Sequence, residues 1–284
     1  MNPREEELLQ AAQAVLKSVA IPAQPRIVME LMKLSNQPGV DVHQIAKKVE
    51  KDPALAAKVL KVANSPLFGL KRSLDSIGQA LHLMGFQLFQ RAILASSLRD
   101  VLQGDRSPTS EVFWIHSELT ARCCEVVAKR LRPQLAQQAY LVGLFHDCAI
   151  SILGRKFPDY QDLAHKALSY RQEAVEEEER RYSTNHCVMG YLFTRSWYLP
   201  ETVRLAILRH HDGEPEYSDD IDARALAAIL RVSEYIVQNY DASGNMKTVE
   251  VSEWLEASSG FLDILGLYSQ DVVDIEEQFL DAVR

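Results

Sequence analysis

The sequence lacks the features that mark membrane, secreted or disulfide-rich proteins. No apolar stretch approaches the roughly 20 residues that a membrane-spanning helix needs. The N-terminus has no basic start followed by an apolar block, so it does not read as a signal peptide. The four cysteines show no Cys-x-x-Cys spacing and lie in apolar segments, at Cys123, Cys124, Cys148 and Cys187. We therefore expect a cytoplasmic protein with no membrane partner, whose cysteines are small core residues.

An excess of positive charge is also absent. The 284 residues carry 31 Lys and Arg against 39 Asp and Glu, so the net charge is −8 and nucleic acid is not an expected partner. Apolar residues make up 47% of the chain, which is enough for a sizeable core. The acidic run at residues 176–179 is expected to be a solvated helix face.

Alternating strand patterns are missing, whereas helical periodicity runs through almost the whole chain, so we expect an all-α protein. Asp52 and Pro53 have the residue types of a helix start, and Gly85 stands where a left-handed C-cap is favoured. Polar segments at 103–108 and 241–245 predict boundaries. They divide the chain into an N-terminal helical bundle at 1–105, a central helical domain at 106–240 and a helical extension at 241–284.

Two adjacent ionisable residues, His146 and Asp147, interrupt the strongly apolar run of residues 139–153. The length and composition of this run predict a buried helix. Buried ionisable side chains are costly unless something satisfies them, and a metal ion would satisfy both at once.

Six of the eight histidines fall between residues 110 and 215, and five of these six lie on or at the end of an apolar helical segment. The five are His116, His146, His186, His210 and His211. A single histidine on such a face is ordinarily a core residue with satisfied hydrogen bonds. Five together with an adjacent Asp favour a metal site, because imidazole suits iron, zinc and nickel and a carboxylate can bridge two ions. Spacing does not establish that the helices converge, so a metal-free polar network is the alternative.

The order of these residues resembles the HD superfamily of metal-dependent phosphohydrolases, including its HD-GYP branch. In that superfamily a His, a His-Asp pair, a third His, a His-His pair and a later Asp ligate a metal cluster. The resemblance implies the ligands His116, His146, Asp147, His186, His210 and His211, with Glu234 at the position of the later Asp.

Longer motifs resemble the HDOD domain more closely. They lie at residues 21–25 (Ile-Pro-Ala-Gln-Pro), 52–69 (beginning Asp-Pro-Ala-Leu-Ala), 76–85, 114–117, 143–147 (Gly-Leu-Phe-His-Asp), 197–200 and 206–211. The likeness covers about residues 20–240, and the run at 52–69 is its most specific part. It implies an N-terminal helical bundle packed on an HD-like α-helical domain.

Three departures from the active enzymes stand out. Where these commonly carry His-Asp-x-Gly-Lys, this chain continues Cys-Ala-Ile, so Ile150 replaces a cation that could hold a phosphate. The Gly-Tyr-Pro loop after the paired histidines is absent. Val112 stands at the position where a Glu ligates a third metal ion in some relatives.

The resemblance therefore implies a bacterial signal-transduction module with little or no catalysis. Its pocket would bind one or two divalent transition metal ions (Fe, Mn, Ni or Zn), and its partners would be signalling proteins or a nucleotide-type ligand. The alternative is an active metal-dependent phosphohydrolase, a phosphodiesterase or nucleotidase, in which Asp147 is the catalytic carboxylate that bridges the ions.

Overall fold

The computed structural model describes residues 3–18, 25–26, 28–30, 41–64, 73–102, 108–167, 172–212, 220–239, 254–255 and 258–283. All regular structure in these ranges is helical, which confirms the expected all-α class. Several sequence features lie outside the described residues: most of the first predicted boundary, the whole second boundary, residues 65–69 of the HDOD-like run, the loop at 213–217 and the side chain of Val112.

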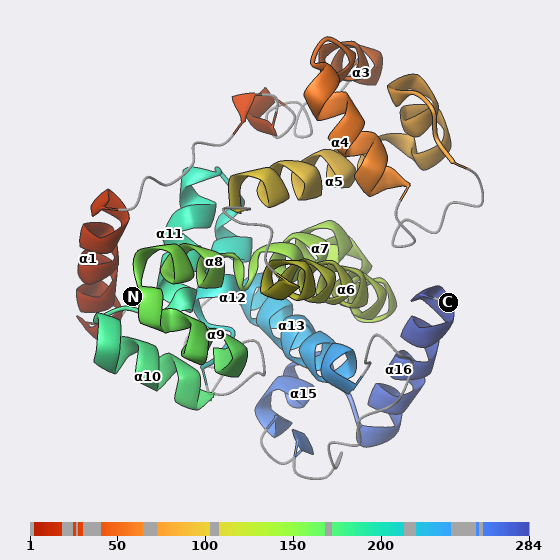
Figure 1. The fold of residues 1–284 in the computed structure, drawn as a ribbon. Helices are drawn as coiled ribbons and strands as arrows, with labels where there is room; N and C mark the ends of the chain where they lie inside the picture. Colours follow the sequence, from red (N-terminus) through yellow and green to blue (C-terminus); the bar gives the residue numbers. More distant parts are fainter. Residues whose placement is uncertain are drawn as a thin grey trace. The chain divides into compact units, whose positions relative to one another are not determined.

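The α-helices in chain order are α1 (Pro3–Ser18), α3 (Val42–Glu50), α4 (Pro53–Ala63), α5 (Ile77–Leu102), α6 (Pro108–Leu131), α7 (Ala136–Phe145), α8 (Cys148–Lys156), α9 (Gln161–Ala167), α10 (Gln172–Tyr182), α11 (His186–Ser196), α12 (Glu201–Leu208), α13 (Ile221–Asn239), α15 (Ser259–Leu265) and α16 (Ser269–Val283) (Figure 1). Short 3-10 turns precede α7 and α9, at Pro133–Leu135 and Pro158–Tyr160. Among the described residues, every helix is too short or too polar to cross a membrane.

The helices group into two compact units. The smaller unit, Pro22–Gly104, contains α3, α4 and α5, each of which packs on the other two. The larger unit contains α1 and the helices from α6 onward. Helix α1, which the sequence analysis grouped with residues 1–105, belongs by its contacts to the larger unit. Its apolar stripe of Leu9, Ala12 and Leu16 is buried, and it packs on α11.

Local signals in the smaller unit act largely as the sequence predicts. Asp52 caps α4, because its Oδ1 accepts a hydrogen bond from the backbone N–H of Leu55 at 3.0 Å, and Pro53 is the first helical residue. Gly85 has the expected positive φ of 72°, but its ψ of 170° is extended. It therefore breaks α5 with a kink rather than forming a left-handed cap, and the helix resumes to Leu102.

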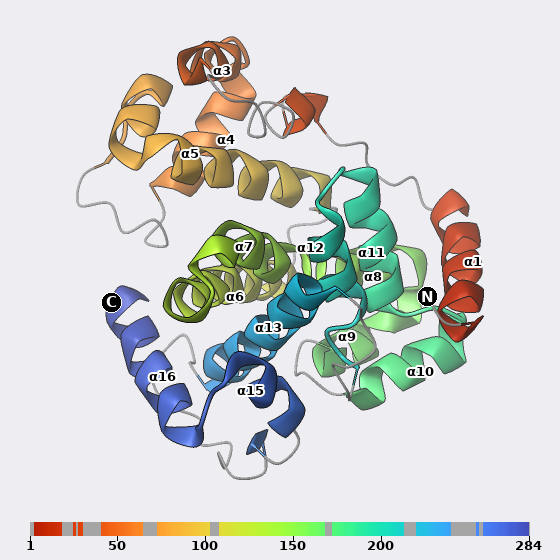
Figure 2. The ribbon, with the colours of Figure 1, turned by 180° about the vertical axis from the view of Figure 1, so that it is seen from behind.

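Helix α13 lies at the centre of the larger unit and packs on α6, α7, α12 and α15 (Figures 1 and 2). Helices α6 and α7 pack closely on each other, and α11 packs on α8 and α12. An aromatic cluster joins the end of α7 to the end of α11. Phe145 lies 5.5 Å from Trp197, and Phe193 lies 5.3 Å from Trp197, between ring centroids.

The expected single helix over residues 139–153 is wrong. The run forms two helices, α7 and α8, which are separated by a turn at His146 and Asp147. Adjacent side chains on a continuous helix point about 100° apart. At this turn Nε2 of His146 and Oδ2 of Asp147 lie 3.0 Å apart, so both side chains face the same interior point.

Gly143 permits the close approach of α7 to α6. A Cβ added at this position would lie 2.6 Å from the Cα of Ala121, and the obstructing atoms belong to the backbone of α6. Side-chain adjustment cannot relieve such a contact, so the two helices would have to separate.

We therefore expect Gly143→Ala to lower the free energy of unfolding by about 1–3 kcal/mol, the usual cost of overpacking a core. Urea denaturation followed by circular dichroism measures this change. Gly154→Ala in α8 is the matched control. Its Cβ would meet Tyr160 at an ordinary 3.8 Å, so the higher helix propensity of Ala should leave stability unchanged or raise it by up to about 1 kcal/mol. Equal urea denaturation midpoints for the Gly143→Ala variant and the parent protein would contradict this account of the helix contact.

Candidate functional site

All seven side chains singled out from the sequence lie together inside the larger unit. His116 comes from α6, His146 and Asp147 from the turn after α7, His186 from the start of α11, His210 and His211 from the turn after α12, and Glu234 from α13. Six of them are at most 5% exposed. The His116 side chain is 14% exposed.

The carboxylate of Asp147 lies between two sets of histidines. Its Oδ2 is 3.0 Å from Nε2 of His146 and 4.0 Å from Nε2 of His116. Its Oδ1 is 3.6 Å from Nε2 of His186 and 3.6 Å from Nε2 of His210. Each oxygen of one carboxylate thus faces a different set of nitrogen atoms, the arrangement in which a carboxylate can bridge two cations.

The potential ligand atoms form two groups, within each of which all atoms lie within 4.8 Å of one another. The first group, which we call group A, contains His116, His146, Asp147 and Glu234. The second, group B, contains His186, Cys187, His210 and His211.

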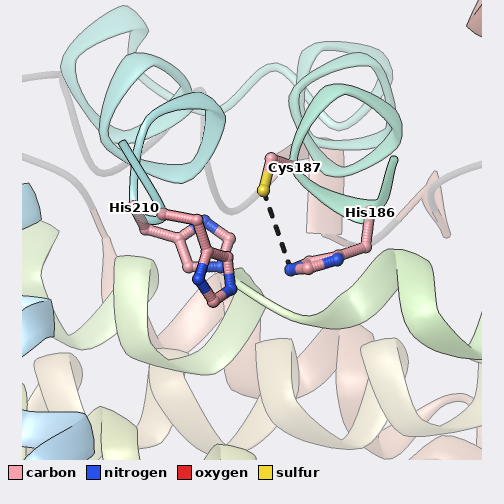
Figure 3. A group of neighbouring side chains, drawn as sticks. His186, Cys187 and His210 are labelled. Atoms are coloured by element: carbon pink, nitrogen blue, oxygen red, sulfur yellow. Dashed lines mark hydrogen bonds between the residues drawn. The ribbon is translucent and has the colours of Figure 1, made fainter. Parts of the chain in front are cut away.

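Cys187 is a member of group B that the sequence analysis assigned to the core. Its Sγ lies 3.7 Å from Nε2 of His186, and both side chains project from the start of α11 on the side that faces His210 (Figure 3). No sequence signal separates it from Cys148, which also directly follows a predicted ligand at the start of a helix but belongs to neither group.

Three histidines are held with Nε2 directed into the cluster. The Nδ1–H of His146 donates to the carbonyl of Gly143 at 2.8 Å, and the Nδ1–H of His210 donates to the carbonyl of Ile207 at 2.7 Å. A carbonyl oxygen only accepts, so these hydrogen bonds fix the hydrogen on Nδ1. Nδ1 of His186 is bound in the same way to Glu178 at 2.8 Å. Anchoring one ring nitrogen to an oxygen acceptor is typical of histidines that ligate metals.

Glu178 is a buried partner of the site that the sequence analysis missed. Its Oε2 accepts hydrogen bonds from both the backbone N–H and Nδ1 of His186, each at 2.8 Å, and its Oε1 accepts from the hydroxyl of Tyr160 at 2.5 Å. The solvated face expected for residues 176–179 is therefore wrong for this residue, which has no exposed surface. Its spacing from Ala174 and Tyr182, four residues on either side and both buried, is the signal that was available.

Two features of the chain bring Glu178 beside His186. The chain reverses between α10 and α11 at Ser183, whose φ of 56° lies in the left-handed region. Asn185 then caps α11, because its Oδ1 accepts from the backbone N–H of Val188 at 2.8 Å. This turn places the last helical segment of α10 against the first turn of α11.

The charges in the cluster favour bound protons when no cation is present. Burial opposes the charged form of His146, but the neighbouring Asp147 and Glu234 outweigh it and raise its pKa to about 9. Burial similarly opposes charge on His186 and His210, yet the pKa of each is raised well above its ordinary value, mainly by Cys187 and by Glu178 or Asp147. Despite burial, His146 and its neighbours hold the pKa of Asp147 well below its ordinary value.

The pKa values of two other members of the cluster are lowered. Burial and the neighbouring His210 and His186 push the pKa of His211 well below its ordinary value. Burial would raise the pKa of the Cys187 thiol, but His186 and His210 outweigh it and lower that pKa. At neutral pH, therefore, His211 is uncharged and offers a lone pair.

Two buried carboxylate oxygens, Asp147 Oδ1 and Glu234 Oε2, accept no hydrogen bond from any residue that the structure describes. Burying a charged oxygen without a hydrogen-bond donor is costly, and a cation that accepts its electron pair removes that cost. Imidazole, thiolate and carboxylate are donors that suit divalent transition metals, so this set of side chains fits the expected ions.

No cation occupies the position where active HD enzymes carry lysine. Ile150 lies in α8, three residues after Asp147, and is only 5% exposed. The residue at this position is therefore apolar and buried in the structure.

Comparison with known proteins places the chain in a family. The profile of the HDOD domain family matches residues 21–213, more than half of the chain. An uncharacterised protein of Treponema pallidum (strain Nichols) is 24% identical over 217 residues, which are 74% of this chain and 42% of that protein. The uncharacterised protein YuxH of Bacillus subtilis (strain 168) is 31% identical over 117 residues, 41% of this chain and 28% of that protein. The chain thus spans less than half the length of these two relatives.

Solved structures share the fold. An HDOD domain protein of unknown function from Geobacter sulfurreducens has a TM-score of 0.74 at 24% identity, covering 98% of this chain and 96% of its own. A candidate phosphohydrolase from Shewanella amazonensis SB2B has a TM-score of 0.70 at 19% identity, covering 95% and 93%. A candidate signal transduction protein from Marinobacter aquaeolei VT8 has a TM-score of 0.74 at 18% identity, covering 99% and 64%. With its profile match and its motifs, the chain belongs to the HDOD domain family.

Proposed function

We propose that this protein is a bacterial signal-transduction module whose buried pocket binds one or two divalent transition metal ions, Fe, Mn, Ni or Zn, and turns over little or no substrate. The observation that carries the proposal is the position of Asp147, whose two carboxylate oxygens face separate sets of histidine nitrogens. The ligands would be His116, His146, Asp147, His186, His210, His211 and Glu234. A metal bound there would supply Lewis acidity and a local positive charge.

Two observations support a regulatory rather than a catalytic role. Ile150 provides no positive charge for a phosphate, and six of the seven side chains are at most 5% exposed, so they are largely shielded from solvent. The partners would then be signalling proteins or a nucleotide-type ligand that responds to the state of the pocket. The four buried cysteines, none of them in a disulfide, support a place in the reducing cytoplasm.

The bridging geometry of Asp147 favours one alternative, an active phosphohydrolase. Many enzymes that cleave phosphate esters hold two ions about 3.5–4 Å apart across a shared ligand. Purified, metal-loaded protein tested on a panel of cyclic dinucleotides, nucleotides and phosphate monoesters separates the two functions. Robust turnover that is lost in Asp147→Asn would establish the enzyme and overturn the regulatory proposal.

Metal analysis of purified protein is the first test. Protein prepared without chelator and then offered Fe, Mn, Ni or Zn should retain one to two ions per chain, as measured by inductively coupled plasma mass spectrometry. Asp147→Asn should lose at least half of this content with its helical circular dichroism unchanged, because the neutral amide is a poor bridge between cations. Asp222→Asn, an exposed change at the start of α13, should bind as the parent does. A content near zero in the parent, with no uptake, would favour the metal-free polar network.

Metal binding should release protons at neutral pH. His146, with a pKa of about 9, holds a proton at pH 7 in the metal-free protein, and His186 and His210 are shifted in the same direction. A metal takes the lone pair that the proton occupies, so apparent affinity should rise with pH up to about 9 and fall on acidification. Zinc titrations by calorimetry in buffers of different ionisation enthalpy measure the protons released.

We expect release of at least one proton per zinc ion at pH 7. The exposed change His82→Ala in α5 is the control and should release the same number. Binding that is independent of pH, with no proton release, would rule out ligation through these histidines.

Glu178 should act as a positioning residue for His186. Loss of an outer partner of a metal-binding histidine typically costs about 10–100-fold in metal affinity. Glu178→Gln keeps the shape but replaces one acceptor oxygen with an N–H donor, so zinc affinity should fall within that range. Glu177→Gln, the neighbour on the same helix whose carboxylate pairs with Arg180 and Arg181 at the surface, should leave affinity unchanged. Equal effects in the two variants would refute the positioning role.

A further inference from the structure

We infer that Cys187 is a metal ligand, and that it joins His186, His210 and His211, together with the bridging Oδ1 of Asp147, in holding a thiophilic cation such as Zn²⁺. The inference rests on the proposed metal binding and assigns one ion to group B. It goes beyond the ligands that the family resemblance implies, because it adds a sulfur donor and fixes the chemistry of one half of the pocket.

The distances in group B suit a tetrahedral ion. Zinc bonds to sulfur at about 2.3 Å and to imidazole nitrogen at about 2.0–2.1 Å, so tetrahedral angles require the sulfur and nitrogen to be about 3.5 Å apart. The Sγ of Cys187 lies 3.7 Å from Nε2 of His186. All four potential ligand atoms lie within 4.8 Å of one another, so a contraction of at most about 1.3 Å would bring the widest pair to a spacing of about 3.5 Å.

The surroundings of group B point independently to a cation. Asp147 Oδ1 faces His186 and His210 at 3.6 Å from each, is fully buried, and accepts no hydrogen bond within the described part of the chain. Nδ1 of His186 is held by Glu178 and Nδ1 of His210 by a backbone carbonyl, which leaves Nε2 of both rings directed at Asp147 Oδ1. Nε2 of His186 also faces the sulfur of Cys187 (Figure 3).

The simplest competing account is that Cys187 is only a small core residue, as buried cysteines usually are. The chain contains the comparison, because Cys123, Cys124 and Cys148 are also buried. Cys148 even follows Asp147 directly, yet it belongs to neither group of potential ligands. Burial alone therefore does not bring a sulfur to the pocket.

A sulfur donor has consequences for metal choice and role. Thiolate favours zinc, ferrous iron, cobalt and nickel over manganese and magnesium, which prefer oxygen. Structural zinc sites have no open position, whereas catalytic sites keep one position for water or substrate. The sulfur of Cys187, added to three histidines and the bridging Asp147, leaves group B without an open position. Group B would then hold its ion tightly and shape the pocket, and exchangeable chemistry would be confined to group A.

Cobalt substitution tests the inference directly. Metal-free full-length protein loaded with Co²⁺ should develop an intense near-ultraviolet absorption band from thiolate-to-cobalt charge transfer. The band should disappear in Cys187→Ser and persist in the matched change Cys148→Ser. Loss of an outer partner alone costs about 10–100-fold in affinity, so loss of the sulfur ligand should weaken zinc binding by at least about tenfold while manganese binding changes little.

The outcomes separate the two proposals. Failure of the parent protein to bind any of cobalt, zinc, iron, nickel and manganese would overturn the metal-binding proposal itself. Binding without the band, or a band that survives in Cys187→Ser, would overturn the role of Cys187 alone. X-ray absorption of the zinc-loaded parent protein gives the same answer without any variant, should Cys187→Ser fail to fold. A sulfur neighbour at about 2.3 Å supports the inference, and only nitrogen or oxygen neighbours at about 2.0–2.2 Å contradict it.

Discussion

The carboxylate of Asp147 is buried between histidines on two sides. The helices of the larger unit are arranged so that these histidines reach both of its oxygens. An ionised carboxylate in a protein interior needs positive or hydrogen-bonding partners on every accessible side. His146 and His116 face one oxygen, and His186 and His210 face the other. These partners come from α6, the turn after α7, α11 and the turn after α12, so that several helices must end or begin at one interior point.

Several local features serve this convergence. The break between α7 and α8 lets His146 and Asp147 face the same side, Gly143 allows α7 to approach the backbone of α6, and Asn185 starts α11 so that His186 stands in its first turn. Gly143 acts twice, because its carbonyl also holds the ring of His146. Their common effect is to fix the directions of ring nitrogens.

Sequence patterns predicted the helical class, and they selected the seven side chains that the structure brings together, because both leave periodic or ordered traces. The histidines recur on apolar helix faces, and the resemblance to HD proteins follows the order of His116, the His146–Asp147 pair, His186 and the His210–His211 pair. The break in the run 139–153 was missed because an apolar composition does not distinguish one buried helix from two. Glu178 was missed because a run of acidic residues resembles a solvated face, and only its spacing reveals that one member points inward.

Cys187 illustrates a different limit. A buried cysteine and a ligating cysteine have the same sequence environment, a small residue in an apolar segment, and only the position of the sulfur relative to the histidine nitrogens distinguishes them. The sequence of α1 likewise shows an apolar stripe but not the surface that the stripe covers. In the structure that surface belongs to α11, which lies in the larger unit.

The spread of the site along the chain has a thermodynamic consequence. Its side chains run from His116 in α6 to Glu234 in α13, and an ion held by them would act as a cross-link between distant segments. In the chain-entropy account, a link that closes a loop on the order of 100 residues lowers the conformational entropy of the unfolded chain. This loss stabilises the folded state by about 5 kcal/mol. The helices around the pocket would then open less readily in the metal-loaded protein than in the metal-free protein.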